Sequence, residues 1–152
     1  MAAVVNQNEV DLRAAAEEGR PGQIRRLHGL GTSVDAPDSN GKTPLYWAAQ
    51  NGNVECLQLL HELGADIGQC RNDGASPVHA AAGNGKIASI RLLLELGADV
   101  NKCSNDGASP VLDAAYKDLH NCIRVLHELG ADVNQANNNG SSPVLIAAVT
   151  GH

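Results

Sequence analysis

The sequence contains no phenylalanine, and its aromatic residues are limited to Tyr46, Trp47 and Tyr116. A core built around large rings is therefore excluded, and the frequent Ala and Leu residues favour helices that pack closely through small side chains. Basic residues are also few: 11 Lys and Arg stand against 17 Asp and Glu, which gives a net charge of -6. Because nucleic acid binding requires clustered Lys and Arg, we expect no nucleic acid partner.

Long apolar runs and sorting signals are missing as well. No stretch approaches the roughly 18 apolar residues of a membrane span. The N-terminal sequence MAAVVNQNEV lacks the basic and apolar regions of a secretion signal. We therefore expect no membrane insertion and a cytoplasmic location, with the nucleus as the alternative.

Motifs of common active sites and cofactor sites do not occur. The sequence has no glycine-rich phosphate loop, no H-E-x-x-H zinc motif and no G-x-S-x-G nucleophile elbow. It also has no C-x-x-C pair and no cluster of His and Cys with zinc-site spacing. We predict that the protein is not an enzyme and that it holds no metal and no cofactor.

What the sequence does contain is a repeat with a period of 33 residues. The segment Asn72 to Ser104 returns almost intact as Asn105 to Asn137, and two sets of residues keep the interval: Gly41, Gly74, Gly107, Gly140, and Pro44, Pro77, Pro110, Pro143. This period is typical of a solenoid, whose units bury their apolar faces only against neighbours. We expect a frayed lead-in over 1–8 and one domain over 9–152. Its units are a degenerate capping repeat (9–39), three full repeats (40–71, 72–104, 105–137) and an incomplete repeat (138–152).

The cysteines follow the same interval. Cys70 and Cys103 occupy one site in adjacent units, and Cys56 and Cys122 occupy another site two units apart. Stacked helices lie about 8–10 Å apart, whereas the Cα atoms of a disulfide lie about 5.5–6 Å apart. We therefore expect reduced thiols with a structural role.

Each full unit carries the signals of two helices. A hydroxyl residue precedes each repeated proline, which predicts an N-cap followed by the first helical residue: Thr43, Ser76, Ser109, Ser142. Gly52 and Gly85 can end this helix with a positive φ, and Asp118 takes that place in the third full unit. A second helix with one apolar stripe ends before Gly64, Gly97 or Gly130. The Asp- and Asn-rich segments between units predict tight, hairpin-like turns.

One motif recurs in these units: Gly-x-Thr/Ser-Pro-Leu/Val, then Ala-Ala, Gly, a Leu-rich helix and Gly-Ala-Asp-Val-Asn. The first full unit matches it at Gly41, Thr43, Pro44, Leu45, Ala48, Ala49 and Gly52. The unit resembles the ankyrin repeat, and the resemblance extends from about Glu9 to the C-terminus. It implies an all-α solenoid of stacked helix-turn-helix units with hairpin-like turns. It also implies a non-catalytic, monomeric scaffold that binds a protein or peptide in a concave groove of first helices and turn tips.

The resemblance places candidate partner-binding residues on two kinds of element. The first helices contribute Trp47, Gln50, Asn51, Asn84, Asp113, Tyr116 and Lys117, and the turn tips contribute Lys42, Asp73 and Asp106. Trp47 stands out because the residues at its position in other units, such as Asp113, share no apolar requirement. We interpret it as an exposed binding anchor, with flat packing over Ala80 and Ala14 as the alternative.

Histidines and asparagines allow further expectations. His79 lies at a position where the resemblance implies a brace between neighbouring turns. His28, His61 and His127 recur near the ends of second helices, where partial exposure is the preferred interpretation and a pH-sensitive stacked row is the alternative. Asn101 and Asn134 lie in the segment that the resemblance marks as a possible target of asparaginyl hydroxylation.

The last unit lacks its second helix, which leaves four apolar residues of its first helix without a partner on one side: Val144, Leu145, Ala148, Val149. We favour a fragment of a longer protein over an end that docks on another molecule. The alternative function is accordingly a targeting or regulatory segment of a larger enzyme or channel, truncated at residue 152. A third hypothesis, an idealised array, is disfavoured by irregular segments such as Tyr116 to His120.

Overall fold

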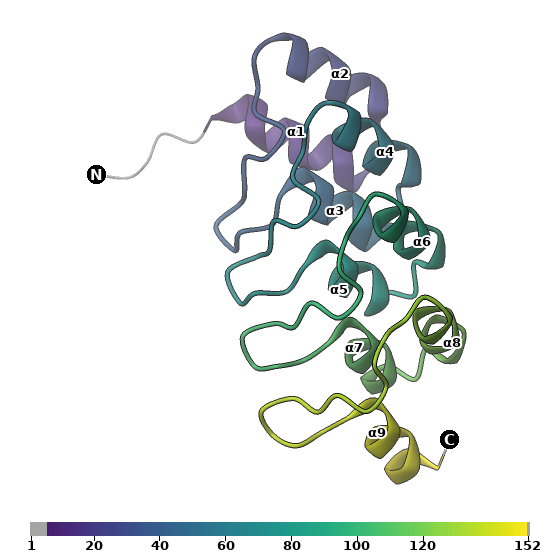
Figure 1. Ribbon diagram of the computed structural model, residues 1–152. Helices are drawn as coiled ribbons and strands as arrows, with labels where there is room; N and C mark the ends of the chain where they lie inside the picture. Colours follow the sequence, from purple (N-terminus) through teal and green to yellow (C-terminus); the bar gives the residue numbers. More distant parts are fainter. Residues whose placement is uncertain (1–5, 152) are drawn as a thin grey trace.

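The structure is a computed structural model that describes residues 6–151. This part of the chain is built from nine α-helices and contains no strand (Figure 1). The helices are α1 (Gln7–Glu17), α2 (Pro21–Gly29), α3 (Pro44–Asn51), α4 (Val54–Glu62), α5 (Pro77–Ala82), α6 (Ile87–Glu95), α7 (Pro110–Tyr116), α8 (His120–Glu128) and α9 (Pro143–Thr150).

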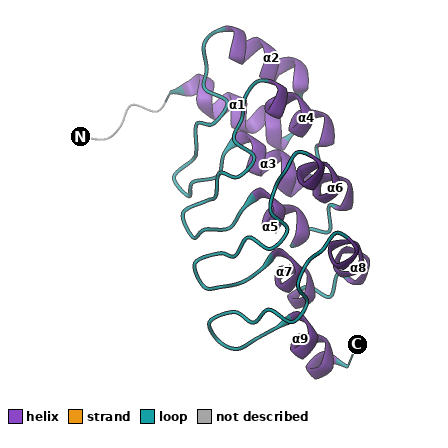
Figure 2. Cartoon of the chain, in the orientation of Figure 1, coloured by secondary structure: helices purple, strands orange, loops and turns teal. Residues whose placement is uncertain are grey.

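The helices form two rows. The first row is α1, α3, α5, α7 and α9, in which each helix contacts the next, and the second row is α2, α4, α6 and α8. Long loops connect one unit to the next and project together from one side of the stack (Figure 2). This arrangement confirms the predicted all-α solenoid of helix-turn-helix units.

The loops are hairpin-like, as predicted, and they are bonded to one another. Within one loop, Arg71 N–H donates to Ala75 O over 3.0 Å. Between loops, Asn72 N–H donates to Asn40 O (2.9 Å), and Asn105 N–H donates to Asp73 O (2.8 Å). The turn tips are thus held at a fixed spacing by backbone hydrogen bonds, which limits the ordering cost of binding a ligand there.

The helix boundaries follow the predicted signals, except that α5 ends at Ala82, with Gly83 and not Gly85 directly after it. Helices α3, α5, α7 and α9 begin at their prolines, and Thr43 Oγ1 accepts a hydrogen bond from Tyr46 N–H over 3.2 Å. Gly52 ends α3 with φ +80°, and Asp118 adopts φ +58° after α7. At the N-terminus, α1 begins at Gln7 and so extends into the predicted lead-in, because the Asn6 side chain accepts from Asn8 N–H over 3.1 Å. Residues 1–5 of that lead-in lie outside the described residues.

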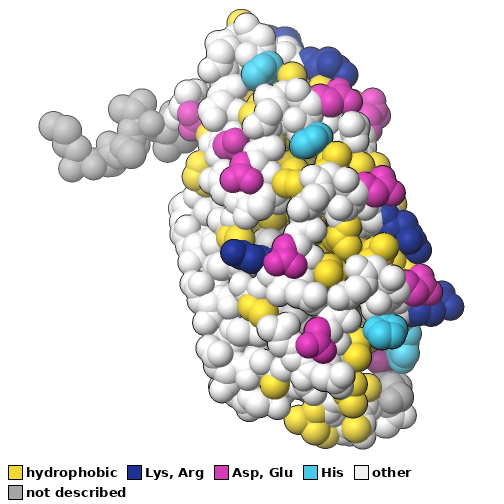
Figure 3. Space-filling model, in the orientation of Figure 1, with side chains coloured by type: hydrophobic (Ala, Val, Ile, Leu, Met, Phe, Trp, Pro, Cys, Tyr) yellow, Lys and Arg dark blue, Asp and Glu magenta, His cyan; other side chains and the backbone are white. Residues whose placement is uncertain are grey.

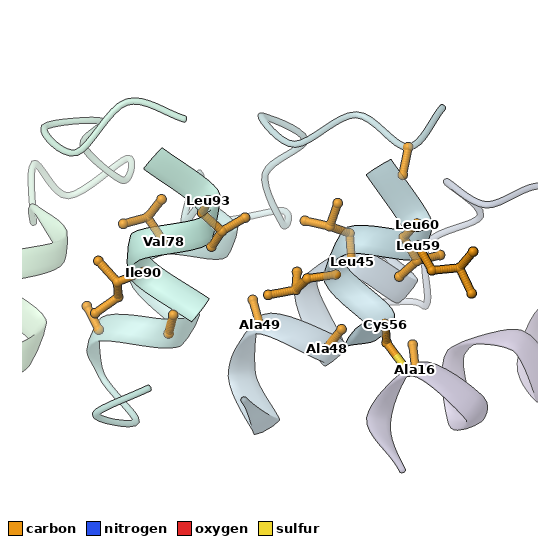
Figure 4. Packing of buried hydrophobic residues seen from close by; sticks show 14 of the residues in the cluster. Ala16, Leu45, Ala48, Ala49, Cys56, Leu59, Leu60, Val78, Ile90 and Leu93 are labelled. Carbon is orange, nitrogen blue, oxygen red and sulfur yellow. The ribbon is translucent and has the colours of Figure 1, made fainter. Parts of the chain in front are cut away.

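The core is a continuous seam between the two rows. Leu45, Leu60, Ile90 and Leu93 are fully buried and come from both rows (Figure 4). Burial of each such side chain contributes about 1.5–3 kcal/mol. Small residues, among them Ala48 and Ala49, let the first-row helices approach closely.

All four cysteines are free thiols. Cys56 and Cys122 are buried in this seam, and burial raises the pKa of each thiol to about 11. Cys70 and Cys103 are half-buried in the loops.

Apolar residues are exposed at the α9 end of the stack. Val144, Leu145 and Val149 are 51%, 47% and 77% exposed, and hydrophobic side chains gather at this end in Figure 3. An apolar hollow of about 340 Å³ lies beside them, between α7, α8 and α9. The predicted one-sided exposure of the last unit is confirmed. No helix within residues 6–151 is long and apolar enough to cross a membrane.

Candidate binding groove

The first-row helices α3, α5 and α7 and the loop before α5 line an open hollow of about 400 Å³, here called the central hollow. Five of the ten candidate residues line it: Gln50, Asn84, Asp113, Tyr116 and Lys117. Lys42 and Asp73 line a second hollow of about 380 Å³ at the turn tips. Neither hollow is lined by Trp47, which is half-buried on α3, or by the exposed residues Asn51 and Asp106.

The repeat itself explains why the central hollow exists. Trp47 and Gln50 of α3 correspond, 33 residues later, to Ala80 of α5 and to Gly83 directly after it. They correspond again to Asp113 and Tyr116 of α7. The middle unit therefore carries almost no side chain where both neighbours carry large ones. A Cβ atom built on Gly83 would lie 3.7 Å from Asp113 Cβ and 3.8 Å from Lys117 Nζ. The floor of the hollow is open because these two residues are small.

A cationic contact covers the only tryptophan. Lys42 Nζ lies 4.1 Å from the centroid of the Trp47 ring and 3.2 Å from Gln50 Oε1. Such a contact is worth about 0.5–1 kcal/mol at an exposed site, and it fixes the indole at the edge of the groove. Neither interpretation of Trp47 anticipated this contact. The sequence held a hint of this contact, because only the unit that carries Trp47 has a lysine at this position. The two following units have Ala75 and Ala108 there.

Arg71 is a groove residue that the sequence interpretation missed. It lines both hollows and donates from Nε to Asp73 Oδ1 (2.6 Å) and from Nη2 to Asp73 Oδ2. This bidentate pair lowers the pKa of Asp73 and raises that of Arg71. The sequence held a hint of this residue too, because Arg71 departs from the repeat. The following units have the uncharged residues Ser104 and Asn137 at its position.

His79 has the structural role that was predicted for it. The ring is buried, and Nδ1 accepts from Ser76 N–H (3.1 Å) while Nε2 lies 2.9 Å from Ala108 O. Because Nδ1 is an acceptor, Nε2 carries the proton and donates it to Ala108 O. The ring thus braces the start of α5 against the loop that precedes α7. Burial lowers the pKa of His79.

Asp113 is the one carboxylate that lines the central hollow. It is half-buried, and within residues 6–151 it makes no hydrogen bond and no ion pair. Burial raises the pKa of Asp113, and the charge of Asp106 adds to this effect, whereas the electrostatic interactions with His79, Arg71 and Lys117 oppose it. Since both ring nitrogens of His79 are already bonded, Asp113 and His79 do not form an acid–base pair of the kind that catalysis needs.

The remaining candidates lie apart from the hollows. His28 and His127 are exposed and His61 is half-buried, which agrees with the preferred interpretation of partial exposure. The Asn101 side chain donates to Gly130 O (3.1 Å) and accepts from Asp132 N–H (2.8 Å), and so joins two units. No group of three or more metal-ligating side chains occurs among the residues that the structure describes.

Comparison with known proteins identifies the repeat. A family model described as ankyrin repeats (3 copies) matches residues 12–104. No curated protein matches the sequence. The matched segment contains α3 and α5, while Asp113, Tyr116 and Lys117 of the central hollow lie beyond it.

Proposed function

The chain belongs to the ankyrin repeat family, and on that premise we propose that it is a non-catalytic scaffold that binds a protein or peptide through the central hollow and the adjoining turn tips. Ankyrin repeats are in general protein–protein interaction modules. The observation that carries the proposal is the central hollow, which is lined by the 53% exposed Tyr116 and by Gln50, three residues after the half-buried Trp47 on the same helix. Aromatic side chains of this kind are frequent anchors of protein interfaces.

The groove is built in advance of binding. Backbone hydrogen bonds join its turn tips, His79 braces two units, and Lys42 holds Trp47. A partner would therefore meet a surface that loses little conformational freedom, which favours affinity. The groove has charges of both signs, Arg71 and Lys117 beside Asp73 and Asp113, and this mixture fits a polypeptide better than a polyanion.

We also propose the cellular compartment and the oligomeric state of the protein. The free thiols support a reducing compartment, the cytoplasm or the nucleus. We propose that the scaffold acts as a monomer, which sedimentation equilibrium at micromolar concentration would test by returning the mass of one chain, 15.8 kDa.

Quantitative affinity capture from cell extract tests the binding function. Three baits are compared: wild type, a groove variant (Trp47→Ala, Tyr116→Ala) and a control variant (Leu30→Ala, Glu95→Ala). The control removes one exposed apolar side chain directly after α2 and one exposed charged side chain at the end of α6, both in the second row. We expect one set of proteins to be retained by wild type and control and lost by the groove variant. Equal retention by all three folded baits would contradict a groove-centred function.

A further inference from the structure

The central hollow has the size and the shape to receive a long side chain. Its volume of about 400 Å³ lies in the range of small-ligand pockets, about 300–1,000 Å³. Ala80 and Gly83 leave the floor open, and Gln50 and Tyr116 stand on either side at the same repeat position. A side chain supplied by a partner would occupy the space above Gly83, between the side chains of Gln50 and Tyr116.

The carboxylate of Asp113 selects the charge of that side chain. A half-buried carboxylate without hydrogen bonds has lost part of its hydration and has received no hydrogen bond in return, which is unfavourable. The surrounding groups offset this loss only in part, because none of them donates a hydrogen bond to the carboxylate. Arg71 is held by Asp73, both nitrogens of His79 are occupied, and Lys117 is exposed to solvent. A cationic donor from a ligand would remove this cost.

Arginine fits the hollow better than lysine. A guanidinium donates two parallel hydrogen bonds to one carboxylate, whereas an ammonium acts as a point charge. A guanidinium plane also stacks on an aromatic ring, and Tyr116, 53% exposed, presents such a ring in the lining that contains Asp113. Lys117 is the competing feature, because it could instead attract an acidic side chain. Because Lys117 is exposed and hydrated, pairing with an acidic side chain contributes less binding free energy there than pairing with a cation contributes at Asp113.

We propose that the partner inserts an arginine side chain into the central hollow, where the guanidinium pairs with the carboxylate of Asp113 and lies against the ring of Tyr116. The inference rests on the proposed function, since it names the chemistry that the same groove recognises. It assigns Asp113 the role of a specificity-determining residue.

The test begins with a phage-displayed library of random dodecapeptides selected on the wild-type protein. We expect a consensus that contains arginine. A selected peptide is then synthesised with arginine and with citrulline, the neutral isostere, and each form is titrated against wild type, Asp113→Asn and Glu95→Gln. Because a desolvated charge pair contributes strongly to affinity, we expect citrulline and Asp113→Asn each to weaken binding at least about tenfold.

The two changes should not add, because each one removes the same charge pair. Glu95→Gln makes the same change of charge on α6, away from the groove, and should bind as wild type does. A second variant, Gly83→Gln, introduces the residue of the α3 position and should block the hollow. Its binding is compared only after its thermal unfolding shows a folded protein.

The outcomes separate this inference from the proposed function. Peptides that bind Asp113→Asn as well as wild type, or an acidic consensus that depends on Lys117, would overturn the arginine assignment and leave the groove function intact. If no peptide is selected, or if selected peptides bind the Trp47→Ala, Tyr116→Ala variant equally well, the proposed function fails and this inference fails with it.

Discussion

His79 donates a hydrogen bond to the carbonyl oxygen of Ala108, with Nε2 and the oxygen 2.9 Å apart. The bond crosses from one repeat to the next and requires the neutral ring, because Nδ1 accepts from Ser76 N–H. Corresponding positions in other units carry Tyr46, Leu112 and Leu145. The brace is therefore a property of this pair of units and not of the repeat as a whole.

Stability should depend on pH through His79. Burial lowers the pKa of the folded ring below its ordinary value of 6.5. The hydrogen bond to Ala108 and the charges of Asp113 and Asp73 raise this pKa, and Arg71 lowers it. The stability that this group contributes is complete above pH 6.5 and declines as pH falls from there, since only the unfolded chain binds the proton readily. We expect urea unfolding at pH 7.5, 6.5 and 5.5 to give a falling free energy of unfolding for wild type.

The matched variant for this prediction is His79→Leu, which introduces the residue found at Leu112 and Leu145. It should show a flatter pH profile. At pH 7.5 it should be less stable than wild type by about 1–3 kcal/mol, because the buried Ser76 N–H loses its acceptor, while Ala108 O keeps its bonds from Ser104 but no longer joins the two units. Parallel pH profiles for the two proteins would show that His79 is not the titrating group.

Two glycines with the same backbone conformation should respond differently to substitution. Gly97 has φ +96° with open space around it, whereas Gly74 has φ +82° and a Cβ there would lie 2.5 Å from Asn105 Oδ1 and 2.9 Å from Asn105 N. Gly97→Ala should cost about 1–2 kcal/mol for the left-handed conformation, and Gly74→Ala should cost about 1–3 kcal/mol more for the clash. Equal losses in chemical denaturation would mean that the turn tips do not pack as closely as described.

Asp118 should be a site where glycine stabilises the protein. It is a non-glycine residue at φ +58°, and glycines occupy the corresponding positions Gly52 and Gly85. Asp118→Gly relieves the backbone strain but loses the exposed contact between Asp118 Oδ1 and His120 Nε2, 3.3 Å apart, which is an ion pair only when the His120 ring is protonated. We expect a net gain of up to about 1 kcal/mol in the free energy of unfolding. Asp118→Asn keeps the conformation and should gain less, and the reverse order would refute the explanation.

Asp113→Asn should weaken peptide binding but stabilise the fold. Burial raises the pKa of its carboxyl group, so the ionised form is disfavoured in the folded state at neutral pH. Asp113→Asn should therefore raise the free energy of unfolding at pH 7, and the difference should shrink as pH falls, because the wild-type carboxyl group then becomes neutral in the fold. An Asn variant that is less stable than wild type at pH 7 would show that the carboxylate is already satisfied.

The sequence predicted the stack but not the contacts within the groove. Proline and hydroxyl residues at a fixed interval act locally, so the helix starts at Pro44 and Pro77 and the positive φ of Asp118 could be predicted. The pairing of Arg71 with Asp73 and the placement of Lys42 over Trp47 depend on side-chain packing between segments, which periodicity does not encode. The small residues Ala80 and Gly83 were visible in the alignment of the units. That they leave a hollow follows only from the positions of the neighbouring helices α3 and α7 in the structure.

The measurement that tests the central claim most directly is an amide chemical-shift map of the 15N-labelled protein with a library-selected peptide bound. We expect the shifted amides to lie on α3, α5, α7 and the loops before them, with the largest changes near Trp47, Asp113 and Tyr116. Amides of α4, α6 and α8 that face away from the groove should remain unchanged. Shifts confined to the second-row helices, or to the exposed apolar end at α9, would contradict the assignment of the groove as the binding surface.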